Sequence, residues 1–474
     1  MNRDDDTASS GPPGEVDVCI IGGGPAGSAV GSRLASLGHR VCLVEAHAFP
    51  RPGIEATLPA AILPLLEFIG ARERVERAGF PRAHETLVWW SEPLPAGRPA
   101  GAEPGFYVDR GKFDLLLLEN AREKGVEILQ PARASLPVRT GGEWQVPVEH
   151  SGGRRTIAAR VLIDAAGRAN PLGGAVRRPA PPLLAMYAYW KIPGALQGCV
   201  EAGDDEWYWA APAGRDRALA AVFLDPLRLR AVAARDRPGF YLRLLERFRL
   251  FAGGQGGSPA GEVRVCDASF CFAEEPSGAG LIRVGDASMR LDPLSSQGVL
   301  SAIAGGIQAA AVANTFLRRP EDSGHAGAFY LARQRERVAS LSRAAAGFYR
   351  EKALQCDRPF WRARMGPAPP PETPAVRPAF PSLGSRVRLS SGVQFIETPV
   401  LKGDLIGPAP AFSHPSLSTP VAYLAGVETV PLLTGIRRGE TLAALLEQWR
   451  EIPPDLAREI LHWLWAREII VADG

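Results

Sequence analysis

Residues Val16–Ser28 read VDVCIIGGGPAGS, an apolar run rich in β-branched side chains that ends abruptly in a cluster of glycines. An apolar helical segment, Ala29–Leu37, follows and stops at Gly38. This order predicts a strand, a tight turn and the start of a helix, which is the context that makes a Gly-x-Gly-x-x-Gly match informative. The pattern therefore predicts a nucleotide-binding strand–turn–helix unit.

Each residue of the turn has a physical role in such a unit. Gly22 permits the turn, Gly24 lets backbone N–H groups approach a pyrophosphate, and Gly27 allows close packing of helix and strand. Pro25 and Ala26 open the helix, whose N-terminus presents unpaired donors and a partial positive charge to the phosphates. We expect these five residues to bind a dinucleotide.

A second predicted strand, Arg40–Val44, ends in an acidic residue, Glu45. A carboxylate at this point accepts hydrogen bonds from a ribose in dinucleotide-binding folds. The alternative is a glycine-rich turn in some other α/β protein. The strand, helix, second strand and acidic end stand in the expected order, which favours the nucleotide site.

Composition excludes several classes of protein. A chain of 474 residues with a net charge of +3 is long enough for two or three domains and has no basic excess typical of nucleic-acid binding. Its six cysteines form no C-x-x-C pair, so we expect neither a disulfide framework nor a metal site. The polar start lacks a signal-peptide pattern, and no apolar run of about 18 residues predicts a membrane span. We expect a cytoplasmic protein without a membrane partner.

Three later segments carry further nucleotide-site signals. Asp109-Arg110 precedes a predicted helix over 115–124. The predicted strand Ile157–Ile163 ends in Asp164-Ala165-Ala166-Gly167, and another strand ends in Gly285-Asp286. Small residues dominate the following helix, predicted over 300–317, and should let it pack closely against a sheet.

The chain resembles the group A flavoprotein monooxygenase superfamily, which binds FAD. The resemblance rests on three motifs: the glycine turn, Asp109-Arg110, and Gly285-Asp286 with Asp292-Pro293…Gly298. The resemblance covers about residues 16–352. It implies that Arg110 contacts the flavin chain, that Asp286 contacts the ribityl–pyrophosphate region, and that the segment from Pro293 through Gly298 to Val299 contacts the isoalloxazine ring.

The predicted fold is α/β, with a Rossmann-like FAD-binding domain, a mixed β-sheet substrate domain and a small C-terminal winged-helix-like α+β domain. The expected boundaries are a disordered tail at 1–14, the FAD-binding domain at 15–80, 101–170 and 262–352, the substrate sheet at 81–100 and 171–261, a Pro-rich linker at 353–385, and the C-terminal domain at 386–474.

Within the superfamily, three stretches look like the flavin-dependent halogenase branch: Arg51…Glu55–Pro59, Trp207–Pro212 and Asp292–Ser296. The middle stretch is similar to the Trp-x-Trp-x-x-Pro motif of that branch, which implies that Trp207 and Trp209 line a substrate pocket. The alternative is that both tryptophans fill one face of a strand.

Two departures from that branch concern its halide chemistry. Halogenases hold hypohalous acid with a lysine, but Phe80–Trp90 contains none, and His84 lies nearest to the expected place. They also carry a Glu where this chain has Ser295. The resemblance therefore implies hydroxylation of an electron-rich ring by reduced FAD and O₂. His84 is a candidate general base, although a lone His is more often structural, and Gln297 is a second candidate catalytic residue.

The C-terminal order of strands, a Leu-Leu-Thr-Gly turn, two helices and a closing strand looks like the peptide-recognition domain of PqqD-type proteins. Such domains hold a peptide by adding a strand to a sheet edge. A helical cap with a packing role is the alternative. With the Ser295–Gly298 variant of the flavin loop, the chain resembles the monooxygenases that mature tryptophylquinone cofactors, as in quinohemoprotein amine dehydrogenase, by hydroxylating a tryptophan of a peptide or small protein.

Other functions stay open from sequence. They are a hydroxylase or halogenase of a small or carrier-bound aromatic metabolite, a prenyl-chain reductase, and a flavin-binding scaffold without catalysis. Gly253–Gly257 lacks the preceding strand of a second dinucleotide fingerprint. We therefore expect NAD(P)H to bind transiently or a separate reductase to supply electrons, and we expect the substrate's other maturation enzymes as further partners.

Overall fold

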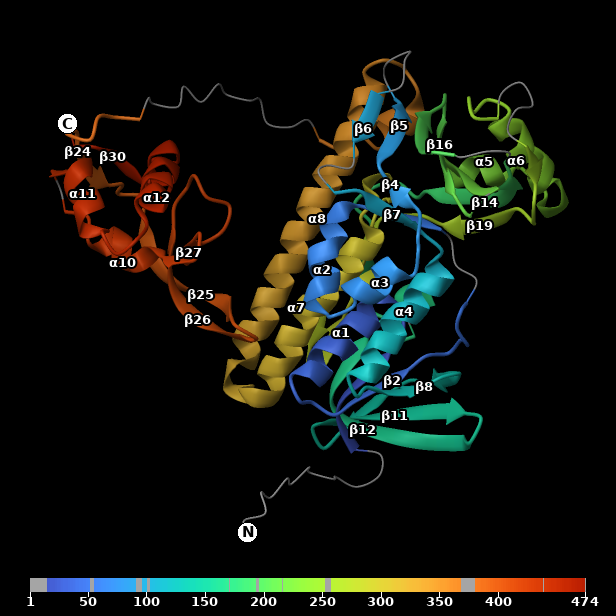
Figure 1. The fold of residues 1–474 in the computed structure, drawn as a ribbon, viewed down its shortest axis with the longest axis horizontal. Helices are drawn as coiled ribbons and strands as arrows, with labels where there is room; N and C mark the ends of the chain where they lie inside the picture. The colour runs from blue at the N-terminus through green and yellow to red at the C-terminus, as the bar shows by residue number, and fades with distance from the viewer. Residues whose placement is uncertain are drawn as a thin grey trace, which may run out of the picture. The chain divides into compact units, whose positions relative to one another are not determined.

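The computed structural model describes residues 15–51, 55–90, 96–99, 103–169, 171–192, 196–214, 216–251, 257–367, 380–437 and 439–473. The chain divides into two compact units: Met1–Arg319 with Tyr330–Pro367, and Pro320–Phe329 with Ala368–Gly474 (Figure 1). The predicted disordered tail, 1–14, and residues 368–379 of the predicted linker lie outside the described residues.

The first unit is built on a sheet whose central strand contains the start of the glycine motif. The parallel strands run in the order β8–β2–β1–β12–β22. Their bounds are β1 Glu15–Ile21, β2 Val41–Val44, β8 Glu127–Leu129, β12 Gly153–Asp164 and β22 Leu281–Arg283. The last four residues of β1 and all of β2 are buried, because layers cover both faces of this parallel sheet.

Helices cover one face of this sheet. Three antiparallel strands, which extend the same sheet through the pairing of β11 with β12, pack against the other face. The helices are α1 Pro25–Ser36, α4 Arg110–Glu123 and α7 Gly298–Arg318, and the strands are β9 Ala132–Ala134, β10 Val138–Thr140 and β11 Glu143–His150. Alternate side chains of β1 point to opposite faces of the sheet. Cys19 and Ile21 pack with Val146 and Val148 of β11, whereas Ile20 faces α1. The sheet is therefore the middle layer of three.

Helix α7 packs against α1 through small residues, as its composition predicts. A Cβ at Gly306 would lie 2.8 Å from the backbone oxygen of Ala26. Among the described residues, α7 alone is long and apolar enough to cross a membrane, yet more than half of its apolar stretch is buried inside the structure. We assign α7 to the core of the first unit.

A second sheet of the first unit is mixed, as the sequence predicts. Its strands run in the order β18–β14–β17–β16–β15–β5–β6, β19 also pairs with β14, and the β15–β5 pair is parallel. The bounds are β5 Glu85–Trp89, β6 Ala96–Pro99, β14 Leu184–Lys191, β15 Gly198–Ala202, β16 Glu206–Pro212, β17 Arg217–Leu224, β18 Ser258–Pro259 and β19 Arg264–Asp267. One face packs through Trp190 and Tyr208 against α6 Arg237–Leu245, which follows the short helix α5 Pro226–Arg230.

Two elements of this region end early. Helix α6 begins at Arg237, with a proline in its first turn, and ends at Leu245. Strand β19 ends at Asp267, and a separate strand, β20 Cys271–Ala273, follows it. The break follows from a turn at Ser269, whose backbone N–H donates to the Asp267 side chain over 2.9 Å and whose hydroxyl accepts from Leu183 N–H over 3.1 Å.

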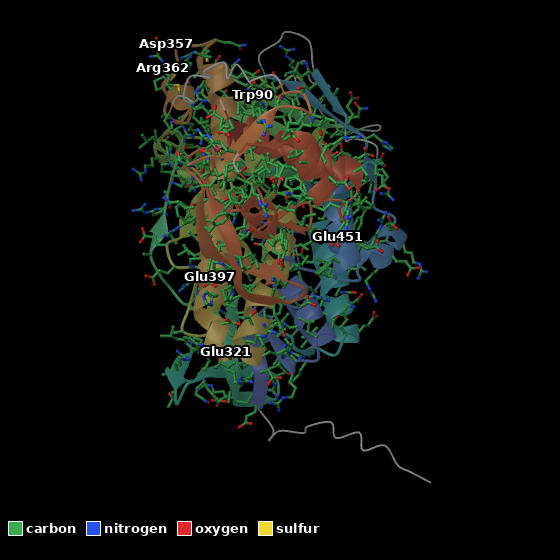
Figure 2. The ribbon with its side chains drawn as sticks, turned by 90° about the vertical axis from the view of Figure 1, so that its left-hand side faces the viewer. Trp90, Glu321, Asp357, Arg362, Glu397 and Glu451 are labelled. Carbon is green, nitrogen blue, oxygen red and sulfur yellow. The ribbon has the colours of Figure 1, made fainter. Side chains whose placement is uncertain are left out.

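Shorter elements connect the two sheets. They are β3 Ala56–Leu58, α2 Leu63–Phe68, α3 Arg72–Arg77, β4 Arg82–Ala83, β7 Gly105–Val108, β13 Val176–Arg177, β21 Ser277–Gly278 and β23 Met289–Arg290. The long helix α8 Ser323–Ala353 is followed by α9 Pro359–Arg362. Trp361 of α9 packs edge-on against Trp90 at 5.4 Å, and Arg362 pairs with Asp357 at the same end of the unit (Figure 2).

The second unit has its own small core. Strand β24 Arg386–Leu389 lies between β29 Glu440–Thr441 and β30 Ile470–Ala472, and Leu445 and Leu461 lie buried in the core that these strands share with α11 Leu442–Gln448 and α12 Pro454–Ala466. The remaining elements are the hairpin of β25 Gln394–Lys402 and β26 Leu405–Ser413, the pair β27 Tyr423–Leu424 and β28 Val427–Glu428, and α10 Thr429–Thr434.

Candidate active site

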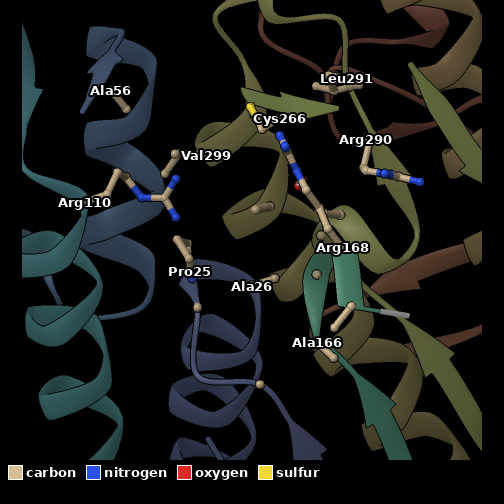
Figure 3. Close-up of a pocket in the computed structure, with 18 of the residues that line it drawn as sticks. Pro25, Ala26, Ala56, Arg110, Ala166, Arg168, Cys266, Arg290, Leu291 and Val299 are labelled. Carbon is tan, nitrogen blue, oxygen red and sulfur yellow. Dashed lines mark hydrogen bonds and ion pairs between the residues drawn. The ribbon is translucent and has the colours of Figure 1, made fainter. Parts of the chain in front are cut away.

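A cavity of about 590 Å³ in the first unit is bounded by the glycine turn and the face of the second sheet opposite α6 (Figure 3). This volume lies in the range of cofactor and substrate pockets. The cavity brings together most residues that the sequence analysis selected: Gly22, Gly24, Pro25, Ala26, Glu45, Arg110, Trp207, Trp209, Asp286, Pro293, Gln297, Gly298 and Val299. Gly27 and His84 are not among the lining residues.

The glycine turn has no room for side chains at two positions. Gly22 adopts φ +107°, and a Cβ there would lie 2.3 Å from the backbone oxygen of Ala165. A Cβ at Gly27 would lie 1.9 Å from the backbone oxygen of Gly22. Gly27 thus lies beneath the lining and holds α1 against the turn, which accounts for its absence from the cavity wall.

The N-terminus of α1 supplies donors to this end of the cavity. No side chain of the described residues caps the helix, and Pro25 occupies its first turn. The unpaired backbone N–H groups and the helix dipole together form an anion-binding site. This arrangement fits the pyrophosphate of a dinucleotide.

Glu45 at the end of β2 is buried and fixed by backbone donors. Its Oε2 accepts from Gly23 N–H and its Oε1 accepts from His47 N–H, both over 2.8 Å. The carboxylate borders the cavity beside the glycine turn. Its predicted role as ribose acceptor is compatible with this position.

Two arginines of the cavity wall converge on one buried carboxylate. Asp114 Oδ1 accepts from Arg110 Nε over 2.9 Å, and its Oδ2 accepts from Arg110 over 3.1 Å and from Arg51 over 3.0 Å. Arg110 is directed toward Pro25 and Val299 at the starts of α1 and α7 (Figure 3). Asp114 therefore positions two cations at the cavity. Sequence analysis missed it, although its spacing of four from Arg110 on a helix is a signal for an ion pair.

Asp286 is held from the end of β12. Arg168 Nε lies 3.2 Å from Asp286 Oδ2, and another Arg168 nitrogen donates to the backbone oxygen of Asp267 over 2.7 Å. Both charged residues line the cavity. Arg168 thus ties the loop after β12 to the segment that the sequence analysis assigned to the flavin.

The loop before α7 is braced by Asp292. Its Oδ1 accepts from Leu294 N–H and its Oδ2 accepts from the Tyr349 hydroxyl on α8, both over 3.0 Å. Burial raises the pKa of this carboxyl group. The loop then turns through Ser296 at φ +50° into Gly298, where α7 begins without a side-chain cap from the described chain. A second set of backbone donors therefore borders the same cavity.

An aromatic wall closes the cavity on the side of the second sheet. Trp207 and Trp209 alternate with Tyr208 on β16, so both face the cavity while Tyr208 faces α6. Trp207 is almost fully buried and stacks on Phe223 at 3.7 Å, whereas Trp209 is only partly buried. Trp207 accordingly packs within the sheet, and Trp209 presents more surface to an occupant.

His84 lies elsewhere. It is exposed between β4 and β5 and is not part of the cavity wall. No lysine occurs among the described residues that line the cavity. We therefore do not assign the role of general base to His84.

The buried carboxyl group of Asp164 makes the free energy of unfolding depend on pH. Its side chain is fully buried, and Oδ1 accepts from Ala166 N–H over 3.2 Å. Oδ2 has no hydrogen-bond partner in the described chain but lies 3.9 Å from Arg283 Nε, whose charge partly offsets the effect of burial on the pKa. Burial raises the pKa of Asp164 in the folded state, so its contribution to stability is present at low pH and is lost as pH rises through the folded pKa.

Asp164→Asn mimics the neutral acid. We expect its unfolding free energy, relative to that of the parent, to be about 1 kcal/mol higher at pH 7.5 than at pH 4.5. Urea denaturation of both proteins at the two pH values measures the difference. A difference that stays constant with pH would contradict the assignment.

Known proteins resemble this chain in sequence and in structure. Residues 15–179 match a family model described as an FAD binding domain. A tryptophan 2-halogenase of Chondromyces crocatus is 29% identical over 374 residues, covering 74% of this chain and 71% of the relative.

Among solved structures, the peptidyl tryptophan dihydroxylase QhpG, essential for tryptophylquinone cofactor biogenesis, superposes with a TM-score of 0.74 and 27% identity, covering 96% of this chain and 99% of the other. The flavin-dependent halogenase CmlS superposes with a TM-score of 0.79 at 19% identity, covering 97% and 96%, and so shares the fold.

Proposed function

Because this chain belongs to the group A flavoprotein monooxygenase and halogenase-like superfamily and is an FAD-dependent oxidoreductase, we propose that it hydroxylates an aromatic ring. The proposed substrate is a tryptophan in a peptide or protein, modified during biogenesis of a quinone cofactor. One observation carries the proposal: a single cavity joins the glycine turn to the tryptophan-bearing wall of the second sheet.

The residues present fit FAD. The glycine turn and the uncapped start of α1 suit the pyrophosphate, Glu45 suits the ribose, and Arg110 and Asp286 lie along the path between them and the loop before α7. FAD, once reduced, supplies the activation of O₂ for transfer to an electron-rich ring. The chain's own residues bind it, and its aromatic wall orients the substrate ring and excludes water.

The cavity wall favours hydroxylation over the alternatives. The lysine that holds hypohalous acid in halogenases has no counterpart among the described lining residues, and Ser295 stands where halogenases carry Glu. Halogenation of tryptophan remains a second candidate because of the relative from Chondromyces crocatus. Glu55 in the wall beside the second sheet disfavours the apolar tunnel that a prenyl-chain reductase needs.

We further propose that the second unit is a winged-helix-like domain that holds the substrate peptide. Support comes from its three-stranded sheet β29–β24–β30, which shares a hydrophobic core with α11 and α12, and from the near-complete coverage of the peptidyl tryptophan dihydroxylase. In this proposal the enzyme works in the cytoplasm, with the substrate's maturation enzymes as partners. NAD(P)H or a separate reductase supplies the electrons.

The test is incubation of the FAD-loaded protein with a tryptophan-containing peptide, a flavin-reducing system and O₂, in chloride-containing and halide-free buffer. We expect a mass gain of one or two oxygens that requires O₂ and does not require halide. A chlorinated product would favour the second candidate. Flavin oxidation with unmodified peptides in every condition would count against both.

A further inference from the structure

We propose that Glu55 accepts a hydrogen bond from a ring N–H or O–H of the aromatic substrate and thereby selects rings that carry such a donor. The proposal rests on the proposed function and names the chemical class of ring that the cavity takes. It assigns a specificity-determining role to a residue that the sequence analysis quoted only as part of a motif.

Glu55 stands in the cavity wall with one oxygen unpaired. It directly precedes β3, and Ala56 and Thr57 beside it also line the cavity. Its Oε2 is buried and has no hydrogen-bond partner in the described parts of the chain. Buried carboxylate oxygens are normally satisfied because an unpaired one is destabilising, so an orphan acceptor on a cavity wall indicates a donor brought by the occupant.

The Glu55 carboxyl group interacts with Tyr189 of β14 in the second sheet. The Tyr189 hydroxyl lowers the pKa of Glu55, and Glu55 in turn raises the pKa of Tyr189. Tyr189 lies opposite Leu219 in the β14–β17 register, and Leu219 lines the cavity, so Tyr189 belongs to the same sheet face as Trp209. Glu55 therefore lies in the cavity wall beside the sheet face that carries Trp209, where we propose that the substrate ring binds.

The electrostatic surroundings make the acceptor sensitive to pH. Burial raises the pKa of Glu55, the hydrogen bond from Tyr189 and the charge of Arg217 on β17 act in the opposite direction, and Asp109 before α4 raises the pKa further. The guanidinium of Arg217 lies over the Tyr189 ring at 4.7 Å. As pH falls, Glu55 is protonated at a higher pH than an ordinary glutamate, and the neutral carboxyl group is a weaker acceptor than the carboxylate.

Indole and 1-methylindole are matched probes, because methylation removes the ring donor and leaves the ring system. Their affinities for the FAD-loaded protein are measured by calorimetry and by perturbation of the flavin absorbance, without turnover. We expect the parent protein to prefer indole by about tenfold at pH 7.5 and Glu55→Leu to bind both probes equally, since a site built around a hydrogen bond rejects an analogue that lacks the donor.

Two further variants separate recognition from folding. Glu55→Gln keeps the shape and should bind indole with no pH dependence. Tyr189→Phe removes the hydroxyl that lowers the pKa of Glu55, and the midpoint of the weakening of indole binding at low pH should then move to higher pH.

Equal affinities in the parent, no saturable indole binding, or an unchanged preference in Glu55→Leu would overturn the proposal. A loss of FAD affinity with unchanged probe preference would also overturn it, because Glu55 would then serve the cofactor. None of these readouts requires oxygenation, so they are distinguishable from failure of the proposed function.

Discussion

Gly27→Ala is expected to reduce the affinity for FAD by about 100-fold, which corresponds to roughly 2.7 kcal/mol, and to give a colourless protein. The new methyl group would lie 1.9 Å from the backbone oxygen of Gly22 and 3.2 Å from Ala165 Cβ. Because the first contact is with backbone, the turn between β1 and α1 must move. The donors at the start of α1 then leave the position at which they meet a pyrophosphate. Titration of the FAD-free protein with FAD, followed by fluorescence quenching, measures the loss.

Gly31→Ala is the matched control, one turn further along the same helix. A Cβ at Gly31 makes ordinary contacts with Val126 and Ile20 at 3.4 and 3.5 Å. The substitution should retain FAD and stabilise the protein by about 0.5 kcal/mol, since alanine favours helices over glycine. Retention of the yellow cofactor by Gly27→Ala at parental affinity would show that the turn does not hold FAD as we describe.

The sequence predicts those parts of the structure whose pattern is local, such as the turn that contains Gly27. The first nucleotide-binding unit is local: strand, turn, helix and second strand lie within residues 15–45, and each signal is read from its neighbours. The expected strand over 40–44 and the helix over 300–317 accordingly agree with β2 and α7 to within two residues.

Contacts between distant segments could not be predicted in the same way. Arg51 meets Asp114 across 63 positions, and Glu55 meets Tyr189 across a still longer separation. Nothing in the local pattern specifies these pairs, because they form only when the loop before β3 packs against α4 and β14. The candidate site was therefore predicted as a set of binding loops, without the charge pairs that position them.

The hairpin β25–β26 was predicted only in part, as a strand over 393–396, for a different reason. Pro399, Pro408 and Pro410 lie within its strands and are typical of loops. In a two-stranded sheet both strands are edges, so a residue without a backbone N–H can face away from its partner at little cost. The prolines therefore made a regular pairing of nine residues in each strand look like a loop in the sequence.

Asp114→Asn is expected to lower the free energy of unfolding by about 2–3 kcal/mol and to weaken FAD binding together with it. The substitution leaves Arg51 and Arg110 close together without the carboxylate that both contact, while Arg51 keeps Glu45 at 3.8 Å. Asp114 is 1% exposed, while the arginine side chains are 30% and 26% exposed. Water therefore reaches the cations in part, which keeps the expected loss below the upper range for a fully buried pair. Urea denaturation of the FAD-free proteins measures the change.

Glu73→Gln provides the control, because Glu73 and Arg77 on α3 form an ion pair with the same spacing of four residues as Arg110 and Asp114. Both members of that pair are about three-quarters exposed, and its loss should change the unfolding free energy by no more than about 0.5 kcal/mol. Equal effects of the two substitutions would mean that burial does not strengthen the Asp114 cluster. A destabilised Asp114→Asn protein with parental FAD affinity would instead mean that the cluster supports the fold alone, since freeing Arg110 would then leave the cofactor undisturbed.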